Sequence, residues 1–415
     1  MIEREIAPHL ARLFEQYPFV TVTGPRQSGK TTLCRAVFGD LAYADLERPR
    51  TRAFASTDPE GFLAQFPDGA VLDEVHRLPE LLSYLKVLGD EKGRNGLFVL
   101  TGSEQFGLLD SVSQSLAGRT AILRLLPLTL AERRLSGADD RLEDVLHSGG
   151  YPRIHDQGLD PTEALGAYYE TYVERDARRI GQIRNLEAFD MFVRLCAGRI
   201  GQLVNLSALG ADAGVTHATA GEWLGVLVRS DIVFRLPPLR ANIRKRLTKT
   251  PKIYFHDVGL AAHLAGIEDP RALATSHMRG PLFENLVVSE AVKHRYNRVR
   301  RPNLSFYRDS SGRECDLICH RAGRLAAIEI KSGATVASDW FTTLGRISED
   351  LPAVTTKAVV YGGTEPQQRT AADVVPWAGF ADYLGQIDAA PYPPPAPGHG
   401  EGPTPLEPPP GGPAL

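Results

Sequence analysis

The sequence is poor in the features of secreted and membrane-spanning proteins. Only four of its 415 residues are cysteines, and they are scattered along the chain. So few thiols exclude a disulfide framework as the basis of the fold. No apolar run reaches the roughly 18 residues that a membrane-spanning helix needs, and the start, Met-Ile-Glu-Arg-Glu, does not resemble a secretion signal. We therefore expect a cytoplasmic protein with no membrane partner. Cys315 and Cys319 lie in an apolar alternating stretch, and we expect them to be buried.

An excess of charge of either sign is also missing. The formal net charge is -3, from 47 basic and 50 acidic residues. This balance neither favours nor excludes nucleic acid as a partner, because a balanced chain can still carry local basic patches. The apolar fraction of 43% is ordinary for a globular protein, and 415 residues exceed what one core usually covers. We expect two or three domains.

The most informative segment that is present is residues 24–31, Gly-Pro-Arg-Gln-Ser-Gly-Lys-Thr. It has the pattern G-x-x-x-x-G-K-[ST] of a phosphate-binding loop, between a predicted strand at 19–23 and a predicted helix at 32–38. Lys30 is expected to reach the β- and γ-phosphates of ATP and Thr31 to ligate Mg²⁺. The predicted nucleotide-binding residues are Gly24, Pro25, Arg26, Gln27, Ser28, Gly29, Lys30, Thr31 and Thr32.

An acidic pair ends the apolar segment 69–73 and predicts the hydrolytic centre. Asp73 is expected to hold Mg²⁺, and Glu74 to orient and deprotonate the attacking water. Transfer to a small acceptor would not need that base, so Glu74 favours hydrolysis over a kinase. At the next strand end either Thr101 or Ser103 fits a γ-phosphate sensor, and we assign Ser103 to the catalytic set.

Arg119 precedes another predicted strand. It fits an arginine finger, in cis or from a neighbouring subunit, and it fits a surface arginine equally well.

The rhythm of apolar runs predicts an α/β fold with three domains and a tail. Residues 1–155 alternate strands and helices, which predicts a mainly parallel sheet. Residues 156–275 read as mostly helical, with a helix–turn–helix around Gly214 and Thr216 and two strands at 232–236 and 252–255, which together suggest a winged helix. Residues 276–387 form a second α/β block, and the Pro-rich residues 388–415 are expected to be disordered.

Four charged residues of the C-terminal block predict a second site. Glu329 and Lys331 share one face of a strand, Asp316 lies on the preceding strand, and Glu284 lies on the helix that opens the block. Glu284, Asp316 and Glu329 would ligate Mg²⁺, with Glu329 and Lys331 as catalytic residues acting on a phosphodiester. The pattern resembles the PD-(D/E)xK nuclease fold, although no proline precedes Asp316 and Glu314 offers a competing acid. A catalytically dead scaffold is the open alternative.

Basic residues beside the predicted winged helix suggest DNA as a partner. Arg244, Lys245, Arg246 and Lys249 are candidates for phosphate contacts, and residues 293–301 form a second basic cluster. A winged helix that packs against protein, with solvated arginines, is the alternative.

Nearly the whole chain except the tail resembles the AAA+ ATPases, and more closely a prokaryotic family of AAA-type ATP-binding proteins with a C-terminal domain of unknown function. The resemblance rests on residues 23–31, 43–47, 72–75, 100–103, 116–119, 149–152, 254–257 and the C-terminal cluster. It implies ATP binding and hydrolysis, and sites shared between subunits of a homo-oligomer. The first hypothesis for the whole chain is ATP hydrolysis coupled to nucleic-acid binding. The second is an ATP-controlled switch that binds a protein partner.

Overall fold

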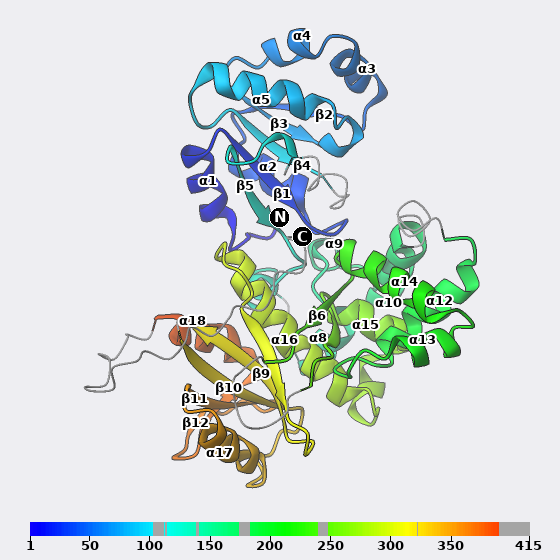
Figure 1. The fold of residues 1–415 in the computed structure, drawn as a ribbon, viewed down its shortest axis with the longest axis vertical. Helices are drawn as coiled ribbons and strands as arrows, with labels where there is room; N and C mark the ends of the chain where they lie inside the picture. Colours follow the sequence, from blue (N-terminus) through cyan, green and yellow to red (C-terminus); the bar gives the residue numbers. More distant parts are fainter. Residues whose placement is uncertain are drawn as a thin grey trace.

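The computed structural model of the protein describes residues 1–102, 112, 114–137, 141–173, 183–239, 248–321 and 323–389. Figure 1 shows three parts: an N-terminal part (residues 1–124) at the top, a helical middle part (130–274) and a C-terminal part (279–389) below it. Several predicted features lie outside the described residues, namely Ser103, Arg244, Lys245, Arg246 and the Pro-rich segment from residue 390 onward.

The N-terminal part is built on a five-stranded parallel sheet with the strand order β2-β3-β4-β1-β5. Strand β1 (Phe19–Thr23) lies inside the sheet, between β4 and β5, and all its residues are buried, because helices cover both faces of a parallel sheet. The mainly parallel sheet predicted for residues 1–155 is present, which confirms the α/β class. The other elements of this part are α1 (Ala7–Gln16), α2 (Lys30–Val37), β2 (Ala42–Asp45), α3 (Pro49–Thr57), α4 (Pro59–Ala64), β3 (Ala70–Asp73), the 3₁₀ turn η1 (Val75–Arg77), α5 (Leu81–Lys92), β4 (Phe98–Thr101) and β5 (Thr120–Arg124).

The middle part is mostly helical, as predicted. Helices α13 (Leu206–Asp212) and α14 (His217–Arg229) are joined by a short turn, and the Thr216 side chain caps α14 by accepting a hydrogen bond from the Thr219 N–H at 3.1 Å. Strands β6 (Val233–Leu236) and β7 (Lys252–Phe255) pair antiparallel. The remaining elements are α7 (Leu130–Arg134), α8 (Leu142–Ser148), α9 (Pro152–Gln157), α10 (Pro161–Tyr168), the π-helical turn η2 (Tyr169–Val173), α12 (Leu186–Ala197), α15 (Val258–Leu264) and η3 (Pro270–Ala274).

The C-terminal part combines a long helix with a six-stranded mixed sheet of order β12-β13-β11-β10-β9-β8. Strands β8, β9 and β10 are antiparallel neighbours, whereas β10, β11 and β13 run parallel. The elements are α16 (Arg279–Asn297), β8 (Leu304–Arg308), β9 (Glu314–Arg321), β10 (Arg324–Lys331), α17 (Trp340–Asp350), β11 (Val354–Tyr361), β12 (Gln367–Gln368), β13 (Asp373–Pro376), η4 (Trp377–Gly379) and α18 (Phe380–Ala389).

Helix α18 corrects the predicted start of the tail. It continues to Ala389, and Asp388, assigned from the sequence to the disordered tail, forms an ion pair with Arg295 at 2.9 Å. The prediction failed because the Pro-rich composition begins only after this helix.

One apolar core extends through the middle and C-terminal parts. It includes Phe192 and Trp223 from the helices together with Phe306 and Val360 from the sheet. Helix α16 is buried over most of its length and lies between the middle part and the C-terminal sheet (Figure 1); its buried residues include polar and charged ones such as Glu290 and Lys293. All four cysteines are buried, including Cys315 and Cys319, for which burial was predicted. Among the described residues, no helix has the length and hydropathy to span a membrane.

Candidate functional site

The phosphate loop connects β1 to α2, and its two glycines are required by the backbone. Gly24 has φ of 140°, and a Cβ there would lie 2.0 Å from the Leu125 carbonyl oxygen. Gly29 has φ of 91° and caps helix α2. Both conformations are disfavoured for any other residue. The loop therefore presents its backbone N–H groups at the N-terminus of α2, an arrangement that suits an anion.

Lys30 lies folded over this loop and is almost completely buried. Its Nζ atom donates to the carbonyl oxygens of Gly24 at 3.0 Å and of Pro25 at 2.8 Å. Burial lowers the pKa of Lys30 to about 8. Beside it, the buried Ser28 hydroxyl has no hydrogen-bond partner among the described residues. A polar group supplied by a ligand would satisfy it.

Asp73, at the end of β3, forms hydrogen bonds with side chains from the two neighbouring strands, β2 and β4. Its Oδ2 atom accepts from the Thr31 hydroxyl at 2.8 Å and the Tyr43 hydroxyl at 2.6 Å, while Oδ1 accepts from the Thr101 hydroxyl and from the Glu74 N–H at 3.1 Å. These donors are all neutral, so they do not cancel the charge of the carboxylate. Thr31 and Asp73 together offer the oxygen ligands that Mg²⁺ prefers, and the residues therefore fit the predicted ion.

Glu74 is held in a conformation that a non-glycine residue rarely adopts. Its φ is 54°, and its Oε2 atom lies 2.9 Å from Nδ1 of the buried His76. Strain of this kind persists only where the surroundings enforce it and is common at functional sites. The backbone here turns the Glu74 side chain away from the line of β3, immediately beside Asp73.

Arg119 does not lie near this site in its own chain. It directly precedes β5, whose first residue pairs with Phe19 at the start of β1, whereas the phosphate loop follows the end of β1. Its guanidinium binds Asp90 on α5 at 2.6 and 2.9 Å. The sequence could not reveal this because the edge of the sheet depends on strand pairing. A finger in cis is thereby ruled out, and a finger toward a neighbouring chain stays a prediction.

Two residues missed by sequence reasoning contact the phosphate loop from outside. Arg4 donates to the Ser28 carbonyl oxygen at 2.7 Å and to the Leu126 carbonyl oxygen at 2.6 Å. Pro152, at the start of α9, lies 3.8 Å from the position that a Gly29 Cβ would take. The motif at 149–152 was visible in the sequence, but only the tertiary structure brings it to the loop.

The predicted carboxylate–lysine cluster also forms, with two additional members. Glu329 and Lys331 are ion-paired at 2.7 Å, and Asp316 accepts a hydrogen bond from the Ile330 N–H at 2.8 Å. The additional members are Lys252, whose Nζ atom lies 3.1 Å from Glu284, and Tyr254, whose hydroxyl donates to the same Glu284 oxygen.

The ionisation of the cluster follows from burial and mutual charge. Burial raises the pKa of Asp316 well above its usual value, and the neighbouring carboxylates Glu284 and Glu329 raise it further. Burial opposes the charge of Lys252, but the surrounding acids Glu284, Asp316 and Glu314 outweigh it and raise its pKa.

The predicted metal ligands Glu284, Asp316 and Glu329 do not fit a metal ion in this arrangement. Two of the three carboxylates are already bound to lysine ammonium groups, and among the described residues no group of three or more acidic, histidine or cysteine side chains is placed to hold an ion. The sequence analysis missed Lys252 because it lies about 60 residues before Asp316, in another part of the chain.

Comparison with known proteins agrees with the nucleotide site. Residues 16–133 match the AAA domain family, residues 139–271 match Domain of unknown function (DUF8612), and residues 279–380 match Domain of unknown function (DUF4143). The uncharacterized protein Rv2008c of Mycobacterium tuberculosis and the uncharacterized protein Mb2031c of Mycobacterium bovis are each 32% identical to this chain over 336 residues, which cover 80% of it and 74% of the relative.

The chain belongs to this family of prokaryotic AAA-type P-loop ATPases. Solved structures are more distant. The Walker-type ATPase PABY2304 of Pyrococcus abyssi is 17% identical, covers 64% of this chain and 96% of its own, and has a TM-score of 0.45. AMPPCP-bound DnaA from Aquifex aeolicus is 11% identical, covers 54% of this chain and 86% of its own, and has a TM-score of 0.29. Likenesses at this level do not assign a function.

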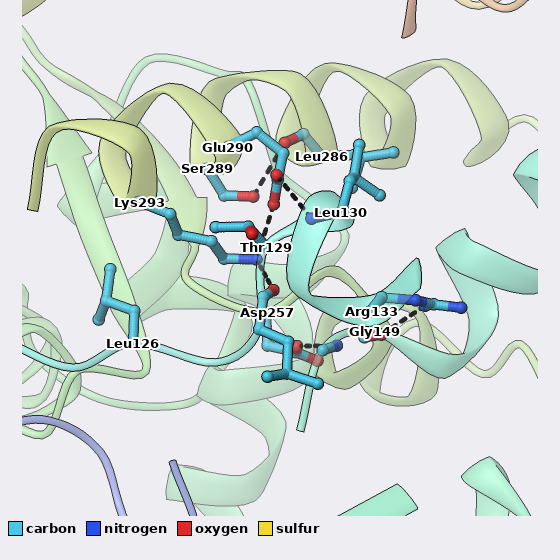
Figure 2. A network of polar contacts seen from close by, with 12 residues as sticks. Leu126, Thr129, Leu130, Arg133, Gly149, Asp257, Leu286, Ser289, Glu290 and Lys293 are labelled. Carbon is cyan, nitrogen blue, oxygen red and sulfur yellow. Dashed lines mark hydrogen bonds and ion pairs between the residues drawn. The ribbon is translucent and has the colours of Figure 1, made fainter. Parts of the chain in front are cut away.

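A buried polar network joins the ATPase part of this family member to helix α16 (Figure 2). Lys293 donates to the Leu128 carbonyl oxygen at 2.9 Å and lies 3.0 Å from Glu290, which accepts from the Leu130 N–H at 2.9 Å. Asp257 accepts a hydrogen bond from the Gly150 N–H at 2.7 Å. Gly150 lies two residues before Pro152, which approaches the phosphate loop.

The second predicted basic cluster is divided in this AAA-type ATPase: Arg300 and Arg301 are exposed, whereas its first three basic residues are buried. Lys293, His294 and Arg295 are buried, and the latter two pair with Asp388 at 3.2 and 2.9 Å. They are therefore unable to reach a phosphate backbone. In the described part of the other cluster, Lys249 is exposed and remains a candidate.

Proposed function

We propose that this protein is an ATP-driven switch. It hydrolyses Mg·ATP in its N-terminal part, and the state of the nucleotide site changes the arrangement of the middle and C-terminal parts. The observation that carries the proposal is the position of Arg4. One side chain bridges the phosphate loop at Ser28 and the connection to the middle part at Leu126, so a displacement of the loop would strain or break a hydrogen bond to that connection.

The hydrolytic centre would use residues that already lie together. The backbone of residues 24–29 and the Lys30 ammonium would hold the phosphates, and Thr31 and Asp73 would hold Mg²⁺. The ion would neutralise negative charge on the phosphate oxygens. Glu74 would accept a proton from the attacking water, with His76 fixing the orientation of its carboxylate.

The route to the C-terminal part supports a switch rather than an isolated hydrolase. Arg4 also pairs with Glu132 at 3.0 Å, and Glu132 closes a capping box with Thr129 at the start of α7. Leu130, which follows Thr129, donates its backbone N–H to the Glu290 carboxylate on α16. A displacement of the phosphate loop would therefore reach α16 through hydrogen-bonded groups that are nearly all buried.

A protein partner fits the C-terminal parts better than cleavage of nucleic acid. Lysine ammonium groups neutralise acids of the carboxylate cluster. On helix α14, the exposed residues before Arg229 are His217, Ala218 and Glu222, and none of them is a lysine or an arginine. A helix that reads DNA normally presents positive charge to phosphates. Nucleic acid is kept as the second candidate because residues 240–252 contain six basic residues and no acid.

An ATPase assay tests the proposal. Glu74→Gln should lower kcat by about 10²–10⁴-fold, the usual contribution of a general base, while Mg·ATP binding is retained. Glu91→Gln, an exposed glutamate on α5, is the matched control and should leave kcat unchanged.

The same assay with single- and double-stranded DNA distinguishes the two partners. A change in kcat of the wild type on adding DNA at low salt would favour nucleic acid. Equal rates for Glu74→Gln and the wild type, or no Mg·ATP binding by the folded wild type, would overturn the proposal itself.

A further inference from the structure

The Lys252 side chain enters the carboxylate cluster from a different part of the molecule. It lies on β7 and is 2% exposed, and its Nζ atom lies 3.1 Å from Glu284 Oε1 and 2.5 Å from Glu314 Oε1. The same ammonium lies 5.4 Å from the centre of the Phe306 ring. The other oxygen of Glu314, Oε2, is ion-paired with Arg308 at 3.1 Å. Two carboxylates and an aromatic face thus surround the Lys252 ammonium, and Arg308 adds a second positive charge beside Glu314.

The loop at Gly201, which is hydrogen-bonded to β7, covers the cluster on the side of Glu284. Gly201 has φ of 73°, and a Cβ there would lie 3.0 Å from Glu284 Oε1. The Gly201 N–H also donates to the Ile253 carbonyl oxygen at 3.0 Å, so this loop and β7 form one wall. Glu284 is therefore enclosed on this side by protein, and its side chain is 21% exposed.

The other acids of the cluster leave little negative charge for a further cation. Glu329 Oε1 is paired with Lys331 at 2.7 Å, whereas the buried Oε2 atom of Glu329 has no hydrogen-bond partner among the described residues. That oxygen would be the remaining acceptor for an ion. An arriving dication would have to approach two ammonium groups held within the same set of carboxylates, and the repulsion opposes its binding.

We propose that the Lys252 ammonium is the permanent counter-ion of Glu284 and Glu314, and that it occupies the place of a divalent cation. The C-terminal part is therefore kept free of metal at this cluster, and the ion pairs fix β7 to β9 and α16. The inference goes beyond the switch proposed above, and its test uses no nucleotide.

Mn²⁺ titration followed by electron paramagnetic resonance tests this assignment. Lys252→Met should gain one Mn²⁺ site that is tighter by about tenfold or more than any in the wild type, since one unit of like charge has been removed. The double variant Lys252→Met/Glu284→Gln should lose that site again. Lys249→Met, an exposed lysine three residues away, is the matched control and should bind Mn²⁺ as the wild type does. Ions bound near Asp73 are common to all four proteins and cancel in the comparison.

A second measurement remains decisive if Lys252→Met does not fold. Glu284→Gln alone keeps Lys252 and the hydrogen bond from Tyr254, and it should bind Mn²⁺ with the same affinity as the wild type. A weaker affinity in Glu284→Gln would mean that the wild type already holds an ion there, and would overturn the inference. A folded Lys252→Met protein that gains no site would overturn it as well.

Discussion

The nucleotide site and the carboxylate cluster are built from the same side chains, acids and lysines, yet they differ in what neutralises the acids. At the nucleotide site, the hydrogen bonds that Asp73 accepts come from neutral donors, three hydroxyls and one N–H. At the cluster, Glu284, Glu314 and Glu329 each contact a lysine ammonium. The difference shows that residue types alone do not make a metal site. A carboxylate must be oriented by neutral donors if its charge is to attract an ion.

The two sites also differ in backbone conformation. Glu74 and Gln27, both at the nucleotide site, have φ of 54° and 59°, values that cost energy for residues with a Cβ. The acids of the cluster on β9 and β10 lie on regular strands. The two sites therefore differ in backbone strain, although Asp231, Val299 and Asn303, outside both sites, also have positive φ.

The largest expected effect concerns the joint between the two regions. Lys293→Met should lower the free energy of unfolding by about 3–5 kcal/mol, because it leaves the buried carboxylate of Glu290 without its cation and the Leu128 carbonyl oxygen without its donor. Chemical denaturation measures the loss. Lys92→Met, at the exposed end of α5, is the control and should change stability by less than about 0.5 kcal/mol. A loss below about 1 kcal/mol in Lys293→Met would show that the joint is not a stabilising contact.

A matched pair of acid-to-amide substitutions sharpens the contrast between the sites. Asp73→Asn should reduce the ATPase rate by about a hundredfold or more, since it weakens the hold on Mg²⁺ and with it the neutralisation of the phosphates. Glu314→Gln removes an acid of the cluster and should leave that rate within about twofold of the wild type, because Glu314 lies in the other region. Steady-state phosphate release measures both. Similar losses in the two variants would mean that the regions are not functionally distinct.

The smallest expected effect is a pH dependence that belongs to the nucleotide site alone. Burial lowers the pKa of Lys30 to about 8 in the free protein, and bound triphosphate would favour the charged form again. Above pH 8 the free protein has lost this proton and must take it up on binding. The Kd for Mg·ATP should therefore rise by about tenfold per pH unit above 8, until the pKa in the complex is reached.

Isothermal titration between pH 7.5 and 9.5 measures this change, together with proton uptake in buffers of different ionisation enthalpy. Without ATP, the same lowered pKa affects the stability of the fold, and there a higher pH is favourable. Between pH 8 and the ordinary pKa of 10.5 the unfolded chain binds more protons at this lysine, so its contribution to stability rises with pH. A Kd that stays constant over the range would contradict the proposed contact between Lys30 and the phosphates.

The nucleotide site could be predicted largely from the sequence because its members follow strand ends in a local pattern. Gly24, Lys30, Thr31 and Asp73 were all named, and parallel strands bring their carboxyl ends to one edge of the sheet. For Arg119 the sequence left an arginine finger and a surface arginine equally open, because it does not show in which direction the following strand pairs. Its strand pairs with β1 so that Arg119 comes at the opposite edge.

The carboxylate cluster was only half predictable. Asp316, Glu329 and Lys331 lie on paired neighbouring strands, and their spacing sufficed to bring them together. Lys252 and Tyr254 come from β7 of the middle part, and no local pattern signals that they enter the cluster. With Lys252 omitted, the acids suggested a metal site. With it included, they are neutralised without one.

By itself, the sequence determined the α/β class, the phosphate loop and the positions of most strands, because apolar periodicity and glycine requirements act over a few neighbouring residues. Only the tertiary structure decided which charges meet. Arg4 reaches the phosphate loop, Lys293 reaches Leu128, and Lys252 reaches Glu284 across long stretches of chain. Electrostatic interactions between such groups depend on distance and burial in space, and neither quantity is written in the order of the residues.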